Sequence, residues 1–141
     1  MSEINDIQDQ IIEEFSIFDD WMDKYAYIIE QGNHLQTIDP KFKEEDKLIN
    51  GCQSKVWLIS EYIDGKVELK AESDAVIVKG IISLLLRVYS GRTPSEIIDA
   101  EPYFIEKIGL SQHLSPTRSN GLLAMIKQIK LYALALKKMQ A

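Results

Sequence analysis

The strongest candidate for a chemically reactive residue is a single cysteine. Cys52 is the only cysteine of the chain, and it lies in the segment NGCQSKVW between two apolar stretches. Gly51 and Gln53 flank it in a turn-like sequence, and functional side chains concentrate on such connections. Gly51 also lacks a Cβ that would obstruct an approaching partner. A single cysteine is either a reactive thiol or a small buried hydrophobe, and the spacing leaves both interpretations open.

A reactive thiol at position 52 would suit sulfur transfer. A thiolate attacks the outer sulfur of a donor persulfide by the displacement chemistry of thiol–disulfide exchange. Because a free thiol has a pKa of about 8.5, a nearby cation or helix N-terminus would raise its ionised fraction at neutral pH. We expect Arg118, at the start of the last predicted helix, to be this cation. Its alternative roles are a surface arginine or a structural ion pair with Asp74.

Other site chemistries have less support in the sequence. His34, His113 and Cys52 show no C-x-x-C or H-x-x-x-H spacing, so we predict no metal site. His113 is a candidate base for a hydrolase that uses Cys52, although no recognised signature accompanies it. We find no G-x-x-x-x-G-K phosphate loop, so the sequence does not indicate ATP binding. Trp21 and Trp57 fall on periodic apolar faces, which predicts core packing.

Two helices are predicted before the cysteine. Apolar residues at three- and four-residue steps predict a helix from Ile4 to Phe18. A second helix should begin after Asp19 and Asp20, which offer a cap, and end at Gly32 or Asn33. The charged stretch that follows, which contains Pro40, reads as a solvated connection that leads to the cysteine.

A small antiparallel sheet is predicted around the cysteine. Leu48 and Ile49 indicate a short strand before it. Two strands should follow, from Val56 to Ile63 and from Lys66 to Ala71, joined by the strong Asp64-Gly65 turn signal. The second of these alternates apolar and charged residues, so one face should meet a core and the other water.

Helices are predicted for the rest of the chain. Ser73 or Asp74 should cap a nearly continuous apolar helix from Ala75 to Tyr89, the central helix of the fold, which ends at Gly91. Thr93 and Pro94 should start a short helix through Ile98, and a further short helical piece is expected from Tyr103 to Leu110. Ser115 and Pro116 should start a final helix to about Met139, with a buried surface made by Leu122, Leu123, Ile126, Ile129, Leu131, Leu134 and Leu136.

This order of elements predicts an α+β fold in which helices pack on one face of a small antiparallel sheet. The 141 residues suit a single domain, residues 1–141. The net charge of −6 argues against nucleic acid as a partner, although residues 115–141 carry five basic and no acidic groups. A protein partner steered by charge fits this asymmetry. Neither a signal peptide nor a membrane-spanning stretch is evident, so we expect a soluble, cytoplasmic protein.

Four segments resemble the SufE/CsdE family of sulfur acceptors. They are KYAYIIEQG, NGCQSKVW, ESDAVIVKGIISLLL and LSQHLSPTRSNGLLAM, which occur in this order between Lys24 and Met125. The combination of GCQS followed by tryptophan, SDA-x-I-V-K-G and H-L-x-P-x-R is specific. Asp74, His113 and Arg118 fall in these segments, but only Cys52 matches a family residue with a defined chemical role. Lys55, where glutamine is common, and Gln31, where leucine is usual, depart from the family pattern.

The resemblance implies a compact α+β fold similar to that of IscU-like iron-sulfur scaffold proteins. It implies that Cys52 takes persulfide sulfur from a PLP-dependent cysteine desulfurase of the SufS/CsdA type and thereby stimulates that enzyme. The sulfur would pass to an iron-sulfur cluster assembly complex of the SufBCD type. This chain would be an accessory protein of sulfur transfer without cofactor, metal or independent turnover. Two alternatives stay open: a desulfurase-binding regulator that accepts no sulfur, and a thiol hydrolase or peroxidase that uses Cys52.

Overall fold

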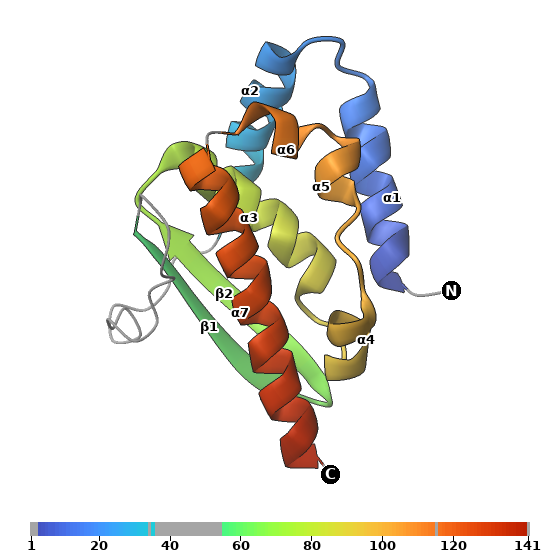
Figure 1. Ribbon diagram of the computed structural model, residues 1–141. Coiled ribbons are helices and arrows are strands. Elements are labelled where there is room, and N and C mark those ends of the chain that lie inside the picture. The colour runs from blue at the N-terminus through green and yellow to red at the C-terminus, as the bar shows by residue number, and fades with distance from the viewer. Residues whose placement is uncertain (1–2, 34, 36–54, 115, 141) are drawn as a thin grey trace.

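The computed structural model describes residues 3–33, 35, 55–114 and 116–140. In these residues the helices pack beside a two-stranded sheet, which forms one side of the molecule (Figure 1). In chain order, the elements are α1 (Glu3–Ser16), α2 (Trp21–Gly32), β1 (Val56–Ile63), β2 (Lys66–Ser73), α3 (Val76–Tyr89), α4 (Pro94–Asp99), α5 (Phe104–Lys107), α6 (Leu110–His113) and α7 (Pro116–Gln140).

The hairpin forms as the sequence predicts, except that β2 continues past the predicted end at Ala71 to Ser73. β1 and β2 pair antiparallel, and their register runs from Ile63 opposite Lys66 to Val56 opposite Ser73. Asp64 and Gly65 both have positive φ, 52° and 79°, as a tight two-residue hairpin turn requires. The turn therefore fixes which residues stand opposite each other along the whole ladder, because pairing proceeds outward from it one residue at a time.

Helices α3 and α7 cover one face of this sheet (Figure 1). Helix α3 is the central helix that its apolar sequence predicts, since ten of its 14 residues are buried. Helix α7 crosses β1, where the Tyr132 hydroxyl donates a hydrogen bond to the Leu58 carbonyl at 2.9 Å. The predicted α+β class, with helices on one face of a small antiparallel sheet, is confirmed.

Helices α2 and α3 approach each other closely at Gly80. A Cβ added at Gly80 would collide with the carbonyl oxygen of Ile28, and one added at Gly32 would lie 2.8 Å from the Gly80 nitrogen. Only hydrogen is small enough at Gly80 for the two backbones to meet in this way. The pair α2–α3 is accordingly one of the most extensive contacts in the described chain.

A partly buried ion pair links the first three helices. Arg87 of α3 donates to both carboxylate oxygens of Glu14 in α1, at 2.9 and 2.7 Å. The Tyr27 hydroxyl of α2 donates to the same carboxylate at 2.6 Å. The hydrogen bonds from Arg87 lower the pKa of Glu14 to about 2, and burial raises the pKa of Tyr27 to about 12. Charge-assisted, two-pronged bonds of this kind fix orientation as well as distance.

Helix α4 is attached to α7 by a lysine. Lys130 donates to the carbonyl oxygens of Ile97, Ile98 and Ala100, at 3.0, 3.1 and 2.7 Å. These carbonyls lie at the C-terminal end of α4, where helical carbonyls lack intrahelical partners and a cation is favoured. At its other end, α4 has the predicted Thr93 cap, completed by Glu96 into a capping box.

The predicted cap of α3 is wrong. The residue before the helix is Ala75, and no side chain of the described residues caps it. Ser73 ends β2 and its hydroxyl accepts from the Ala75 N–H at 3.2 Å, while the Asp74 carboxylate bonds to Lys55. Two residue types that favour caps are thus used in the strand-to-helix turn, where local hydrogen bonds compete with capping.

The predicted buried surface of α7 is partly wrong. Leu122, Ile126 and Ile129 are buried as expected, whereas Leu123, Leu131 and Leu134 are 63, 46 and 41% exposed. Helix α7 packs with one side only, and the exposed leucines belong to the other side. Its apolar residues therefore occupy two faces, of which the fold covers one.

The remaining boundaries differ little from expectation. The first helix ends at Ser16, and the second has its predicted Asp20 cap and ends at Gly32. The piece predicted from Tyr103 to Leu110 is two short helices, α5 and α6, separated at Gly109, whose φ is 89°. The proposed strand at Leu48 and Ile49 and the proposed cap at Ser115 lie outside the described residues.

Candidate functional site

The described residues next to the Cys52 segment belong to the sheet and to the central helix. Cys52, Gly51 and Gln53 lie outside the described residues, so their predicted roles stay predictions. Lys55, three positions after Cys52, is the first described residue after this segment, and it leads directly into β1. The beginning of β1, the end of β2 and the beginning of α3 lie at the same end of the molecule (Figure 1).

Asp74 closes the hairpin at this end. Its carboxylate accepts a hydrogen bond from the Lys55 N–H at 3.2 Å, and its own N–H donates to the Lys55 carbonyl at 3.4 Å. These bonds extend the ladder by one residue pair beyond Val56 and Ser73, the last pair within the strands. Asp74 thus joins the residue that follows the cysteine segment to the residue that precedes α3.

The N-terminus of α3 adds positive electrostatic character to this end. The first turn of the helix begins at Val76, which is 59% exposed. The N–H groups of a helix's first turn are not bonded within the helix, and with the aligned peptide dipoles they favour a nearby anion. A thiolate is such an anion, and helix N-termini lower the pKa of cysteines placed beside them.

Arg118 lies in the first turn of α7, which begins near the same end of the molecule (Figure 1). Its side chain is half-buried and interacts with its surroundings. The structure thus brings the elements of Asp74 and Arg118 to one end. The expected assistance of Arg118 to the Cys52 thiolate stays a prediction, since the thiol lies outside the described residues.

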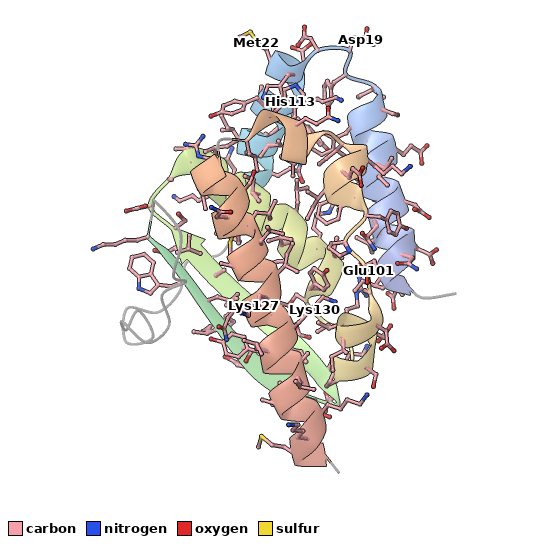
Figure 2. All side chains as sticks on the ribbon, in the orientation of Figure 1. Asp19, Met22, Glu101, His113, Lys127 and Lys130 are labelled. Carbon is pink, nitrogen blue, oxygen red and sulfur yellow. The ribbon has the colours of Figure 1, made fainter. Side chains whose placement is uncertain are left out.

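His113 is held by two contacts at the end of α6. Its Nδ1 lies 2.9 Å from the Gly109 carbonyl, which can only accept, so Nδ1 carries the proton in this contact. Its ring stacks on Trp21 with centroids 4.2 Å apart and an interplanar angle of 11°. Figure 2 shows His113 near the end of the molecule that carries Asp19 and Met22. These contacts give the exposed imidazole a structural role in joining α6 to α2.

Sequence reasoning missed two of these contacts. The bonding of Lys55 to Asp74 could have been found by counting outward from the two-residue turn, because the register that places Val56 opposite Ser73 places Lys55 opposite Asp74. No comparable signal pairs Trp21 with His113, since this contact joins helices far apart in the sequence. Trp21 was assigned to core packing, and the ring is half-buried.

Two features are absent from the described part of the chain. No group of three or more histidine, cysteine or carboxylate side chains is placed to hold a metal ion among the described residues. None of the helices in that part of the chain is both long and apolar enough to cross a membrane.

Comparisons with known proteins agree on one family. The family model described as "SufE: Fe-S metabolism associated domain" matches residues 9–133, a range that contains Cys52, Asp74, His113 and Arg118. An uncharacterized SufE-like protein of Rhizobium meliloti (strain 1021) is 41% identical over 128 residues, which cover 86% of this chain and 91% of that protein.

A solved structure supports the fold. The solution structure of a hypothetical protein from Thermus thermophilus matches with a TM-score of 0.77 and 21% sequence identity, covering 96% of this chain and 97% of that one. At this identity the likeness shows the fold alone. On the strength of the matching family model and the similar relative, this chain belongs to the SufE family, whose domain is associated with Fe-S metabolism.

Proposed function

We propose that this protein is a sulfur acceptor that carries sulfur on Cys52 from a cysteine desulfurase to an iron-sulfur cluster assembly complex. The Cys52 thiolate attacks the outer sulfur of a persulfide on the desulfurase's own cysteine. A bond forms between Cys52 Sγ and that sulfur, the donor's S–S bond breaks, and the donor cysteine leaves as a thiolate. No oxidant or reductant is consumed, because one persulfide replaces another.

The observation that carries this proposal is that the SufE family model matches a chain with a single cysteine. The matched range spans residues 9–133 and includes Cys52, the only thiol that the chain offers. A single thiol suits a carrier, which needs one acceptor sulfur, better than a cluster scaffold, which needs several ligands. The Fe-S association of the family supplies the metabolic context.

The described residues next to the Cys52 segment support a thiol presented at one end of the hairpin. Covalent geometry keeps the Cα of Cys52 within about 11 Å of that of Lys55, because the two are three residues apart. Lys55 is fixed by Asp74, and α3 begins two residues further on, at Val76. The positive end of α3 and the guanidinium of Arg118 are the two sources of electrostatic support that we propose for the thiolate.

The partners follow from the chemistry of the transfer. The donor is a PLP-dependent cysteine desulfurase, and acceptance by Cys52 stimulates it by removing the sulfur that blocks its next turnover. The recipient is a cluster assembly complex, and the exchange takes place in the cytoplasm. The carrier itself contributes the thiol and the docking surface and performs no turnover alone.

Mass spectrometry of the Cys52 peptide tests the proposal. After incubation with a cognate desulfurase and cysteine, this peptide should gain about 32 Da, one sulfur atom. Cys52→Ser should abolish both the gain and the stimulation of the desulfurase while leaving the fold intact. Stimulation that survives in Cys52→Ser would indicate a regulator that accepts no sulfur. Turnover of a small ester or peroxide without any desulfurase would indicate a thiol enzyme.

A further inference from the structure

We propose that the outer face of α7 is a docking surface for the cysteine desulfurase, which binds it with an acidic segment that presents an apolar ridge. We call this face the α7 stripe, made of Leu123, Lys127, Leu131, Leu134 and Lys138. The inference rests on the proposed function, because it assigns a surface to the partner named there.

The α7 stripe is a continuous surface on one side of the helix. Its members follow at steps of four, four, three and four residues, which places them on one helical face. From Leu123 to Lys138 this face is about 22 Å long, at 1.5 Å of rise per residue. The opposite side of α7 is the packed side, which carries the buried Leu122, Ile126 and Ile129.

The apolar part of the stripe is unusually exposed for leucine. Leu123 is 63% exposed, Leu131 46% and Leu134 41%. Single exposed leucines are common on protein surfaces, but three on one face of one helix make a row. Such a row is the kind of surface that another protein covers with its own apolar side chains.

The charge of the stripe specifies the partner. Residues 115–141 contain five basic and no acidic groups, so all 22 acidic residues lie elsewhere in the chain. Lys130 is occupied by the α4 carbonyls, whereas Lys127 and Lys138 are exposed. Figure 2 shows Lys127 and Lys130 on α7. An acidic partner is therefore attracted to this helix and repelled by most of the remaining surface, which orients the approach.

A hollow beside Leu123 gives the stripe a place for an anchoring side chain. It has a volume of about 400 Å³, and its apolar lining includes Leu123, Ile105 and Ile126. Glu101 and Glu106 also line it. A complementary partner therefore places an apolar side chain in the hollow and a basic residue near these glutamates, with its carboxylates further along at Lys127 and Lys138. This pattern fixes the direction in which the partner lies on α7.

The location of the stripe favours the desulfurase over a second copy of this chain. Helix α7 begins near the end of the molecule where Asp74 closes the hairpin, so a partner that reaches Cys52 can continue along α7 (Figure 1). A second copy could offer the acidic face of α1, whose exposed residues include Asp6, Asp9 and Glu13, but the exposed Ile17 that follows this helix is a single side chain and not a row. It would lack the apolar ridge.

Binding of a cognate PLP-dependent desulfurase to matched variants tests the α7 stripe. Leu123→Glu and Leu134→Glu should each raise the Kd about 10-fold, as expected for apolar contact residues. Lys127→Glu should raise the Kd about 5-fold and reduce its dependence on salt. Met22→Glu, at an 80% exposed apolar position of α2, and Lys107→Glu, on α5, are the controls and should stay within about twofold of the wild type.

The outcomes separate this inference from the proposed function. Circular dichroism first verifies that each variant is folded, which exposed positions permit. Wild-type protein that gains sulfur on Cys52, with the Kd unchanged in all three stripe variants, would overturn the docking surface and leave the sulfur relay standing. Wild-type protein that gains no sulfur would overturn the relay and the docking surface with it. Stripe variants that lose only self-association, measured by sedimentation, would assign the stripe to a second copy and overturn the proposal.

Discussion

Replacement of Asp74 tests whether its hydrogen bond to Lys55 affects the reactivity of the Cys52 thiol. In Asp74→Ala the N–H of Lys55 loses its carboxylate acceptor, 3.2 Å away, while the backbone bond from the Asp74 N–H to the Lys55 carbonyl remains possible. Asp74→Asn keeps an oxygen at the accepting position and removes the charge. The two variants therefore separate the hydrogen bond from the charge.

The structure sets the size of the effect. Lys55 and Asp74 are both exposed, so the bond is screened by water and is worth about 1 kcal/mol. A change of 1 kcal/mol alters the population of an open form about 5-fold. If the segment before β1 opens to present its thiol, Asp74→Ala should react about 5-fold faster at Cys52, and Asp74→Asn should stay close to the wild type. The global stability of either variant should fall by about 1 kcal/mol or less.

A chromogenic thiol reagent at low concentration and pH 7 measures this rate in the folded protein, and urea unfolding measures the stability. Equal rates in Asp74→Ala, Asp74→Asn and the wild type would refute the idea that this hydrogen bond restrains the thiol. Equal acceleration in both variants would instead assign the restraint to the charge of Asp74.

Three further predictions concern stability, each measured by urea unfolding. Because the folded pKa of Glu14 lies at about 2, below its ordinary 4.5, its stabilisation is complete above about pH 5 and is lost as the pH falls toward 2. Glu14→Gln should thus cost about 2 kcal/mol at pH 7 and far less near pH 2, while the exposed control Glu13→Gln costs under about 0.5. Tyr89→Phe should leave stability unchanged or raise it by about 1 kcal/mol, because the buried hydroxyl has no hydrogen-bond partner among the described residues; a clear loss would contradict this. Lys130→Met should cost about 2 kcal/mol by removing the donor to three carbonyls, against little change for the exposed Lys127→Met; equal costs would contradict this account.

The hairpin could be predicted from the sequence almost to the residue. Aromatic and β-branched residues before Asp64 and alternating apolar and charged residues after Gly65 mark the strands, and a turn of two residues admits one register. Local signals decide such an element, because the turn and the strands that it joins are adjacent in the chain. The caps at Asp20 and Thr93 were predictable for the same reason.

The exposed face of α7 could not be predicted. Leucines at positions 122, 123, 131 and 134 fall on different sides of the helix, and the periodic pattern does not say which side the other elements will cover. Coverage depends on tertiary contacts, here with α3, α4 and β1. The predicted cap of α3 is wrong because an aspartate at position 74 can accept a hydrogen bond either from the first turn of the helix or from the backbone beside it in the hairpin. In the structure the N–H of Lys55, just before β1, donates to Asp74.

Some residues of the candidate site could be predicted from the sequence and others could not. The importance of Cys52 came from its segment, GCQS before a strand, and the family match covers that segment. The contacts of Asp74 follow from the hairpin register, but those of His113 depend on how α6 lies against Trp21. Stacking between residues so far apart in the chain depends on the whole fold, and no short sequence pattern predicts it.

The meeting of Gly80 with the Ile28 carbonyl has a consequence for how this protein can change over generations. Every amino acid other than glycine carries a Cβ, so no amino-acid substitution at position 80 is conservative, whatever the chemistry of the new side chain. Exposed positions of α1 can accept substitutions, but the close spacing of α2 and α3 depends on glycine at position 80. A substitution there would misfold the protein while leaving Cys52 unchanged, a loss of function that the candidate site alone would not explain.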